Sequence, residues 1–502
     1  MRRFLFLGSV FLTLFLLVTI AYAQPKPVSG GSLTIAQGVE PPGLDPTTAT
    51  SAAIPRVVYG NVLEGLVRID RNGKIIPALA SKYTISKDGK EYTFSLKKGV
   101  KFHDGKSFDA EDVKFTFGRL MDPPPQVTIP NKRYYQDIES IEVADPYTIK
   151  FKLKSVNSMF LFNLARPDSI IIHKEAADKL KTAPVGTGPF KLLEWVRGDR
   201  ILLEKFAAYH RKGFPYLDKV TFKFIGDPSA QIAGLRAGDI DVIGYDVSPE
   251  NALLLERDPK FKVFNGYTTT EVILSTNNSR KPFNDVRVRR AMAHAIDRSA
   301  LIKGVMSGYG TPIGSHMDPG NPYYIDLTST YPFNPEKAKQ LLTEAGYPNG
   351  FEAVIKVPER FAYAKRSGEI ITDMLSKVGI QLKIELTEWG QWIDRVLRNA
   401  DFDLTVIGHS EPFDIDIYAN PKYYFRYDNP KFQETLKKAE MEPNPKLRRE
   451  LYIALQKMIT EDAVNGFLFV MPSLPTMKKE VMNWWKDYPM TAQDVTEVWI
   501  QK

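Results

Sequence analysis

Residues 352–410 constrain the fold of this chain more than any other segment, because apolar runs of strand length alternate there with helical patterns. The pattern predicts strands over 352–357, 380–385 and 402–408, and helices over 362–378 and 389–399. Strand–helix–strand units of this length form parallel sheets through right-handed crossovers. We therefore expect an α/β fold with a parallel sheet in this part of the chain.

The length and a change of pattern near 262–277 indicate more than one domain. The chain has 502 residues, which is more than one hydrophobic core usually serves. Two extended runs, 262–264 and 271–277, flank the polar stretch Gly266-Tyr267-Thr268. We place a crossing between domains at this point.

The first 23 residues have the pattern of a secretory signal peptide. Arg2 and Arg3 precede an apolar run from Phe4 to Ile20, and Ala21-Tyr22-Ala23 supplies the small residues of a cleavage site. A membrane anchor is the alternative, but the run is interrupted by polar residues and is short for a span of about 20 residues. We expect cleavage after Ala23.

Composition excludes several classes of function. The chain contains no cysteine, which rules out disulfides, thiol catalysis, cysteine-bound metal and lipid attachment at a cysteine. The formal net charge is +8, with basic and acidic residues interleaved and no polybasic block. We therefore expect a solvated surface and no nucleic-acid partner.

Candidate binding loops follow from the predicted parallel sheet, because ligands bind beyond the carboxyl ends of such strands. In the second half of the chain the rule selects loops 358–361, 387–389 and 409–414, and in the first half it selects 38–40 and 245–246. The candidate ligand-binding residues are Val39, Glu40, Tyr245, Asn277, Arg360, Trp389, His409, Ser410, Glu411, Phe413 and Asp414.

Five of these residues also have a structural interpretation. Trp389 either stacks on a ligand or covers a helix amino terminus. Glu411 and Asp414 either bind an ammonium group or cap the following turn. His409 is either a ligand contact or a hydrogen-bonded structural residue. Arg360 either pairs with a carboxylate or is solvated at the surface.

Catalytic motifs are missing from the sequence. It has no Gly-x-Ser-x-Gly elbow, no His-Glu-x-x-His pair and no glycine-rich dinucleotide turn after a strand. The stretch from Gly99 to Ser107 resembles a phosphate-binding loop but has five residues between its glycines instead of four. We expect no enzyme activity and no cofactor. A secreted hydrolase with distant carboxylates and a secreted structural or chaperone-like protein are the alternatives.

Four segments carry a resemblance to a known family. They are 92–117 (YTFSLKKGVKFHDGKSFDAEDVKFTF), 184–190 (PVGTGPF), 282–298 and 344–348 (EAGYP). The chain resembles the family 5 extracellular solute-binding proteins, the peptide-, nickel- and oligosaccharide-binding subunits of ABC importers. The resemblance covers nearly all of the chain after the signal peptide.

This resemblance implies a two-lobe periplasmic-binding-protein fold of type II, with an extra subdomain in lobe I and the ligand cleft between the lobes. Lobe I would comprise 24–267, with 60–181 as the extra subdomain. Lobe II would comprise 268–470, and 471–502 would return to lobe I. The protein would be a periplasmic monomer that captures a small solute by lobe closure and delivers it to inner-membrane ABC permease subunits.

One departure from the family pattern bears on the solute. Peptide-binding members hold the α-amino group of the ligand with an aspartate at a position that corresponds to Gly408 here. Glu411, Asp414 or Asp416 would have to replace it. An oligopeptide or dipeptide is the first expectation, and an oligosaccharide or opine is the alternative. We expect no metal site, because the six histidines are scattered without ligand spacing.

Overall fold

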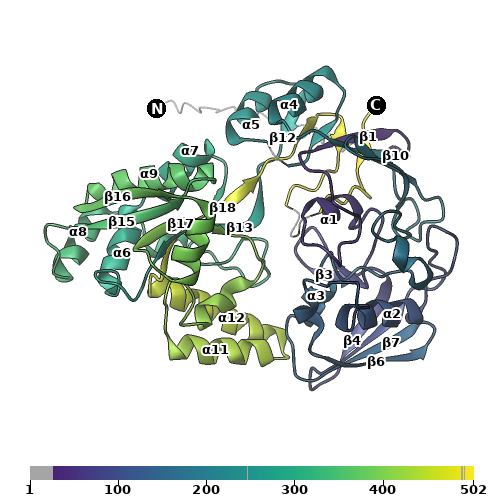
Figure 1. Ribbon diagram of the computed structural model, residues 1–502, viewed down its shortest axis with the longest axis horizontal. Helices are drawn as coiled ribbons and strands as arrows, with labels where there is room; N and C mark the ends of the chain where they lie inside the picture. The colour runs from purple at the N-terminus through teal and green to yellow at the C-terminus, as the bar shows by residue number, and fades with distance from the viewer. Residues whose placement is uncertain (1–25, 246, 488–489, 491) are drawn as a thin grey trace, which may run out of the picture.

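The computed structural model describes residues 26–502 except 246, 488–489 and 491. The predicted signal peptide, residues 1–23, and the candidate loop residue Asp246 lie outside the described residues. Figure 1 shows two bodies side by side, each built on its own sheet and joined at one end.

The first body contains a seven-stranded sheet. In spatial order its strands are β12 (Phe261–Val263), β19 (Thr476–Lys478), β11 (Val242–Ile243), β1 (Ser32–Gln37), β10 (Lys219–Phe224), β9 (Arg200–Lys205) and β8 (Phe190–Val196). β1 runs parallel to β10 and β11, and the other neighbours are antiparallel. The helices here are α1 (Ala53–Val58), α4 (Pro228–Ala237) and α5 (Pro249–Glu256). Side-chain oxygens of Asp227 and Ser248 cap α4 and α5.

A four-stranded antiparallel subdomain is attached to the first body. Its order is β4 (Ala80–Ile85), β5 (Glu91–Leu96), β7 (Thr148–Leu153) and β6 (Ile138–Asp145), with α2 (Ala110–Met121), α3 (Phe160–Leu164) and the pair β2 (Val67–Ile69) and β3 (Ile75–Pro77). The helix expected behind Asp109 is α2, and Asp109 and Asp112 cap it reciprocally. Its buried Phe117 packs edge-on against Phe151 at 5.0 Å between ring centroids.

The second body contains the alternating strand and helix patterns of residues 352–410. Its six-stranded sheet has the order β14 (Thr311–Pro312), β18 (Asn465–Ser473), β13 (Gly266–Thr276), β17 (Leu404–His409), β15 (Phe351–Pro358) and β16 (Ile380–Thr387). β15 runs parallel to β16 and β17, as the sequence predicts. Helix α9 (Ala362–Ser376) is the first crossover. The second is shorter than expected: α10 (Trp389–Trp392) continues as a π-helical turn, Ile393–Arg398.

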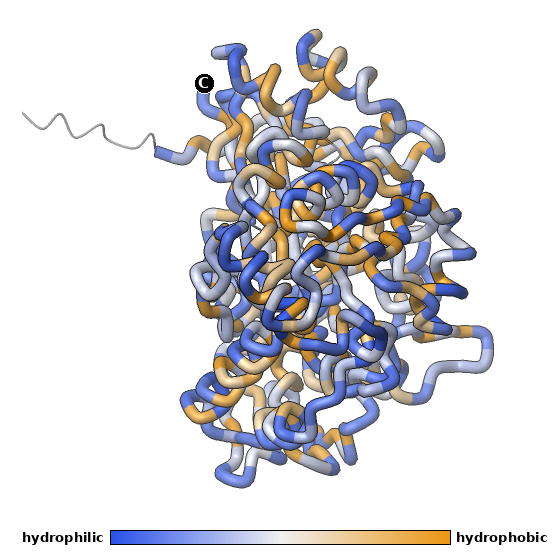
Figure 2. Tube along the Cα trace, turned by 90° about the vertical axis from the view of Figure 1, so that its left-hand side faces the viewer, coloured by the Kyte–Doolittle hydropathy of each residue, from blue (hydrophilic) through white to orange (hydrophobic). Residues whose placement is uncertain are grey.

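Further helices surround this sheet. They are α6 (Val286–Ala295), α7 (Arg298–Met306), α8 (Pro335–Glu344), α11 (Pro430–Met441) and α12 (Pro445–Glu461). Figure 2 shows apolar segments running through the interior of the molecule and hydrophilic segments along much of its outer edge. Among the described residues, no helix combines the length and apolar content that crossing a bilayer requires.

Two connections join the bodies side by side. The chain leaves the first sheet after Val263 and enters the second at Gly266, and it returns between Ser473 and Thr476. The amide of Phe264 donates to the carbonyl of Pro475 at 3.0 Å, so the two connections are bonded to each other. The remaining strands, β20 (Val481–Met482) and β21 (Trp499–Ile500), follow the return. The exact bounds of the lobes and of the subdomain stay a prediction.

Candidate functional site

A cavity of about 990 Å³ lies between the two bodies, at the upper end of the range for small-molecule sites, about 300–1,000 Å³. One wall comes from the subdomain: Arg133, Tyr134, Asn157, Met159, Phe162, Asn163 and Arg166. The facing wall comes from loops after β15, β16 and β17 and from β13. Phe162 and Phe413 meet across the cavity, with ring centroids 4.4 Å apart.

The parallel pairing of β15, β16 and β17 explains why these loops meet. The carboxyl ends of the three strands, Pro358, Thr387 and His409, lie at one edge of the sheet. The predicted residues that line the cavity are Trp389, His409, Ser410, Glu411, Phe413 and Asp414. Arg360 lies beside it, with its guanidinium carbon 5.5 Å from the ring centroid of Trp389. Contact of these residues with a solute stays a prediction.

Trp389 belongs to an aromatic wall. Its ring stacks on Trp392 at 5.2 Å, nearly parallel, and Phe361 meets it edge-on at 5.2 Å. The carboxylate of Glu388 accepts from the amides of Gly390 and Gln391 and thereby caps the helix. The indole of Trp389 therefore does not serve as the cap, and part of it is exposed to the cavity.

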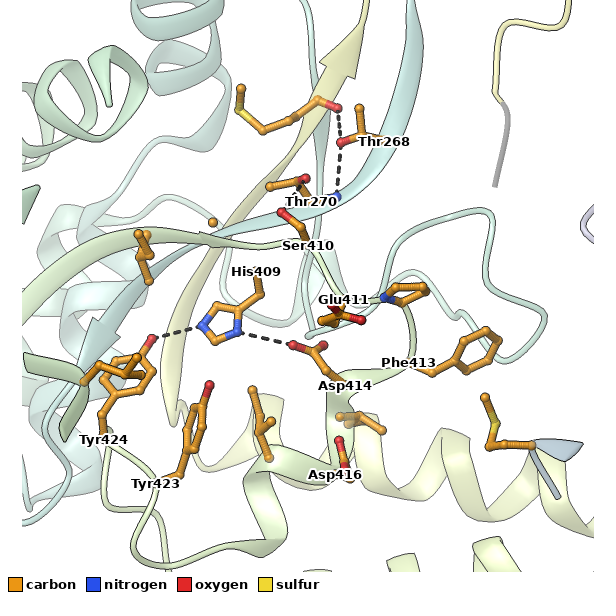
Figure 3. A pocket seen from close by; sticks show the side chains of 18 of the residues that line it. Thr268, Thr270, His409, Ser410, Glu411, Phe413, Asp414, Asp416, Tyr423 and Tyr424 are labelled. Atoms are coloured by element: carbon orange, nitrogen blue, oxygen red, sulfur yellow. Dashed lines mark hydrogen bonds and ion pairs between the residues drawn. The ribbon is translucent and has the colours of Figure 1, made fainter. Parts of the chain in front are cut away.

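His409 and Asp414 belong to a buried hydrogen-bonded cluster (Figure 3). Asp414 faces His409 Nδ1 at 3.3 Å and His316 Nε2 at 2.9 Å. The other ring nitrogens are paired with tyrosine hydroxyls: His409 Nε2 with Tyr424 at 3.0 Å, and His316 Nδ1 with Tyr418 at 3.1 Å. Asp414 thus fixes the loop and does not point unpaired into the cavity.

The charge of this cluster follows from its surroundings. Burial by itself would raise the pKa of Asp414, but His316 and His409 outweigh it and hold that pKa well below its ordinary value. Burial lowers the pKa of His409. Burial, together with Asp414 and Asp318, raises the pKa of neighbouring Glu271 far above its ordinary value. Glu271 pairs directly with His409 across β13 and β17, so both side chains lie on the same face.

Opposite charges face each other across the cavity. Glu411 and Asp416 lie on the loop after β17, and Arg133 and Arg166 lie on the subdomain. The hydrogen bond with Tyr134, and then the charges of Glu411 and Asp416, raise the pKa of Arg133. Among the described residues no ion pair joins the acidic loop to the arginines, so a gap remains between the two charges.

The arginine wall, Arg133 and Arg166, was not predicted from the sequence. Arg133 donates to the Tyr134 hydroxyl at 2.9 Å. Arg166 pairs with Asp168 at 3.2 Å and lies over the Tyr134 ring at 4.1 Å. The cluster of basic and aromatic residues at 132–135 was the available signal, but its position relative to the loops depends on how the subdomain packs.

A second cavity of about 250 Å³ adjoins the first, and Thr268, Thr270 and Ser410 line both. Tyr245, predicted from the end of β11, lines the second cavity. Its hydroxyl donates to the carbonyl of Ala492 at 3.0 Å, and the guanidinium of Arg56 lies 3.9 Å from its ring centroid.

The structure does not bring Val39, Glu40 or Asn277 to either cavity. Glu40 accepts from Trp195 Nε1 and from the amide of Gly198, both at 3.0 Å, which turns its loop away and leaves Val39 on the surface. Asn277 is buried and donates to the carbonyls of Ala400 and Phe402. Because β13 is antiparallel to β17, its carboxyl end lies at the opposite edge of the sheet. We therefore remove these three residues from the proposed site.

Gly408 has no room for a side chain. A Cβ atom there would lie 2.8 Å from Thr270 Cγ2 and 3.1 Å from the Tyr363 hydroxyl oxygen. That oxygen also accepts from the Gly408 amide at 3.0 Å. The aspartate of the family pattern does not fit at this position unless its neighbours move, and Glu411 and Asp416 are the acids that remain exposed nearby.

Known proteins that resemble this chain in sequence and structure are solute-binding proteins, as a cavity between two bodies suggests. The sequence model of the bacterial extracellular solute-binding proteins, family 5 (middle), matches residues 74–431. The glutathione-binding protein GsiB of Pectobacterium atrosepticum is 33% identical over 383 residues, which is 74% of this chain and 73% of that protein. The periplasmic binding protein DppA of Helicobacter pylori, solved with the peptide STSA, is 30% identical with a TM-score of 0.72, covering 95% and 99% of the two chains.

The opine alternative also has a structural relative. The Agrobacterium tumefaciens protein AgaA, solved with agropinic acid, is 29% identical with a TM-score of 0.70, covering 94% of this chain and 99% of that one. The expected type II periplasmic-binding-protein fold is confirmed by these neighbours. The chain belongs to family 5 of the bacterial extracellular solute-binding proteins, the solute-binding subunits of ABC importers.

Proposed function

We propose that the protein captures short peptides for an ABC importer and binds them as zwitterions across the cleft. The opposed charges of the cavity carry this proposal. Glu411 and Asp416 would receive the terminal ammonium group, and Arg133, supported by Arg166, would receive the carboxylate. The relatives, a glutathione-binding protein and a protein solved with the peptide STSA, support the same class of solute.

The aromatic wall would accommodate peptide side chains between the two charged ends. Trp389, Phe361 and Tyr423 offer flat apolar surfaces that do not require one particular side chain, and the buried rings of Trp392 and Tyr424 support them. An uncharged oligosaccharide would use the same rings but would leave both charged groups unmatched. An opine that carries a carboxylate would satisfy the arginine side, which is why it enters the test below.

A zwitterion that touches both walls would also stabilise the closed protein. Only contacts that exist in the closed state and not in the open one shift the balance toward closure. The carboxylate would hold the subdomain and the ammonium group the second body, so loss of either charge would weaken closure as well as binding. The solute would be released unchanged to the inner-membrane permease subunits, without turnover.

The remaining details of this proposal rest on the sequence. The signal peptide would be removed after Ala23, and the mature protein would diffuse as a monomer in the periplasm, since it has no cysteine for a lipid tether. Amino-terminal sequencing and light scattering of protein purified from the periplasm test both points. A mature chain that begins elsewhere, or a stable dimer, would contradict them.

The zwitterion is tested with three forms of one tripeptide: free, N-acetylated and C-amidated. Each charge-assisted hydrogen bond is worth about 1.5–3 kcal/mol, so each blocked end should raise the Kd by about tenfold or more. Arg133→Gln should weaken the free peptide similarly but leave the amidated peptide unaffected, and Glu411→Gln should do the same for the acetylated one. Lys132→Gln and Glu359→Gln, which lie outside the cavity lining, are the matched controls.

Calorimetry on protein freed of co-purified solute measures the Kd of each peptide form for the wild type and each variant. Equal affinity for all three peptide forms would refute the zwitterion model. Binding of an opine or an oligosaccharide in place of every peptide would assign the cavity to that class of solute.

A further inference from the structure

The cluster beneath the cavity has the composition and spacing of a transition-metal site. His316, His409 and Asp414 each offer one ligand atom, and these three atoms lie within 4.8 Å of one another. His316 Nε2 and His409 Nδ1 converge on the two oxygens of Asp414 at 2.9 and 3.3 Å. Ligands about 2.0–2.2 Å from a tetrahedral ion lie roughly 3.3 Å apart, so the donors are already near the required spacing.

The surroundings of the two histidines match those of metal ligands. In metal sites the second ring nitrogen of each histidine is held by a hydrogen-bond partner that fixes the ring orientation. Here the hydroxyls of Tyr418 and Tyr424 have that role. Tyr418 is itself fixed by Asn465, which donates to its hydroxyl at 2.9 Å. The tyrosines therefore orient both imidazoles, and the opposite ring nitrogens face the two oxygens of Asp414.

A second carboxyl group points independently to a cation. Glu271 is 4% exposed, and its Oε2 finds no hydrogen-bond partner within the part of the chain that the structure describes. It is placed beside His409 by the β13–β17 pairing. A buried carboxyl oxygen without a partner is costly, and the positive charge of an ion bound at the neighbouring cluster would offset part of that cost. Once Glu271 loses its proton on metal binding, it and Asp414 would balance the charge of a divalent ion.

We propose that His316, His409 and Asp414, with Glu271 as the charge-balancing carboxyl group, bind a divalent transition metal ion such as Zn²⁺. Two imidazoles and a carboxylate are a ligand set that suits Zn²⁺ and its neighbours rather than Mg²⁺ or Ca²⁺. His409 and Asp414 line the large cavity, so the ion is reached from the cleft. The proposal does not depend on which solute the cleft accepts.

The first experiment titrates Zn²⁺ into untagged, chelator-treated protein without solute. Calorimetry should show one ion per chain. X-ray absorption of the loaded wild-type protein should show two imidazoles and oxygen ligands, with Zn–N distances of about 2.0–2.1 Å. Mg²⁺ at the same concentration should not compete. This measurement needs no variant and therefore does not depend on whether a substituted protein folds.

Variants then locate the ion. His409→Gln and Asp414→Asn each remove a ligand and should weaken Zn²⁺ binding by more than the roughly 10–100-fold that loss of an outer partner costs. Glu271→Gln and Tyr424→Phe alter outer partners only, so their loss of Zn²⁺ affinity should fall within that range. His294→Gln is the matched control, because His294 is a histidine of helix α6 outside the cluster.

Three results would overturn the proposal. They are absence of stoichiometric Zn²⁺ binding, an absorption spectrum without two imidazoles, and unchanged affinity in a folded His409→Gln protein. Because peptide binding is measured separately on metal-free protein, failure of this site leaves the zwitterion test intact.

Discussion

Gly408→Ala provides a stringent test of how the loop after β17 is built. The added Cβ would lie 2.8 Å from Thr270 Cγ2 and 3.1 Å from the Tyr363 oxygen, so at least one neighbour must move. The hydrogen bond from the Gly408 amide to Tyr363 is strained by the same movement. Overpacking of this kind costs typically about 1–3 kcal/mol. We expect the free energy of unfolding to fall by that amount.

A second substitution identifies the cause of the loss. Thr270→Ser removes Cγ2, the nearest obstacle, but keeps the hydroxyl that lies 3.0 Å from the Ser410 hydroxyl. Combined with Gly408→Ala it should recover at least about 0.5 kcal/mol beyond the sum of the single effects, the lower end for residues in contact.

The control is a glycine with open space around it. Gly118 lies in helix α2, and a Cβ there meets no atom within 4 Å. Gly118→Ala should therefore be neutral or stabilising by up to about 1 kcal/mol. Urea unfolding followed by circular dichroism measures the wild type and the four variants, with equal m-values as the condition for comparing them. If Gly408→Ala is as stable as the wild type, or Thr270→Ser fails to rescue it, the account of the tight loop is wrong.

Two further predictions concern the first body. Burial lowers the pKa of His103 from 6.5 to about 4, and its Nδ1 accepts from the Gly186 amide. Between these two pH values His103 is therefore neutral in the folded protein and protonated in the unfolded chain. Stability should fall by up to about 3 kcal/mol as the pH drops from about 6.5 to about 4, and His103→Gln should remove this part of the slope in unfolding curves; parallel slopes would refute it. Asp109→Ala removes the cap of helix α2 and should cost about 1 kcal/mol, whereas Asp109→Asn should cost less; equal losses would contradict the capping role.

The sequence predicts the second body well because its elements follow local patterns. The strands and the first helix of 352–410 appear where the periodicity places them, and their parallel pairing gathers the loops with Trp389 and Glu411. Loop positions follow from the sheet rule, which does not depend on long-range packing. The π-helical turn after Trp392 could not be foreseen, since its residues fit an ordinary helix equally well.

The missed and misplaced residues share a physical cause. Arg133, Arg166 and His316 reach the site through tertiary packing, and no local pattern encodes the distance between the subdomain and the loops. Asn277 lies away from both cavities because β13 is antiparallel to β17, which puts its carboxyl end at the opposite edge of the sheet from His409. Histidine spacing along the chain likewise gave no sign of the pair that His316 and His409 form in space.

The paired connections between the bodies have a mechanical consequence. Two connections that lie side by side and are bonded through Phe264 and Pro475 have the arrangement of a hinge about which two bodies can close on a ligand. Any ligand that bridges the two bodies would therefore favour the same hinge closure, whatever its position in the cavity. A partner that docks on the outer faces of both bodies would therefore distinguish only two states of the protein, empty and loaded.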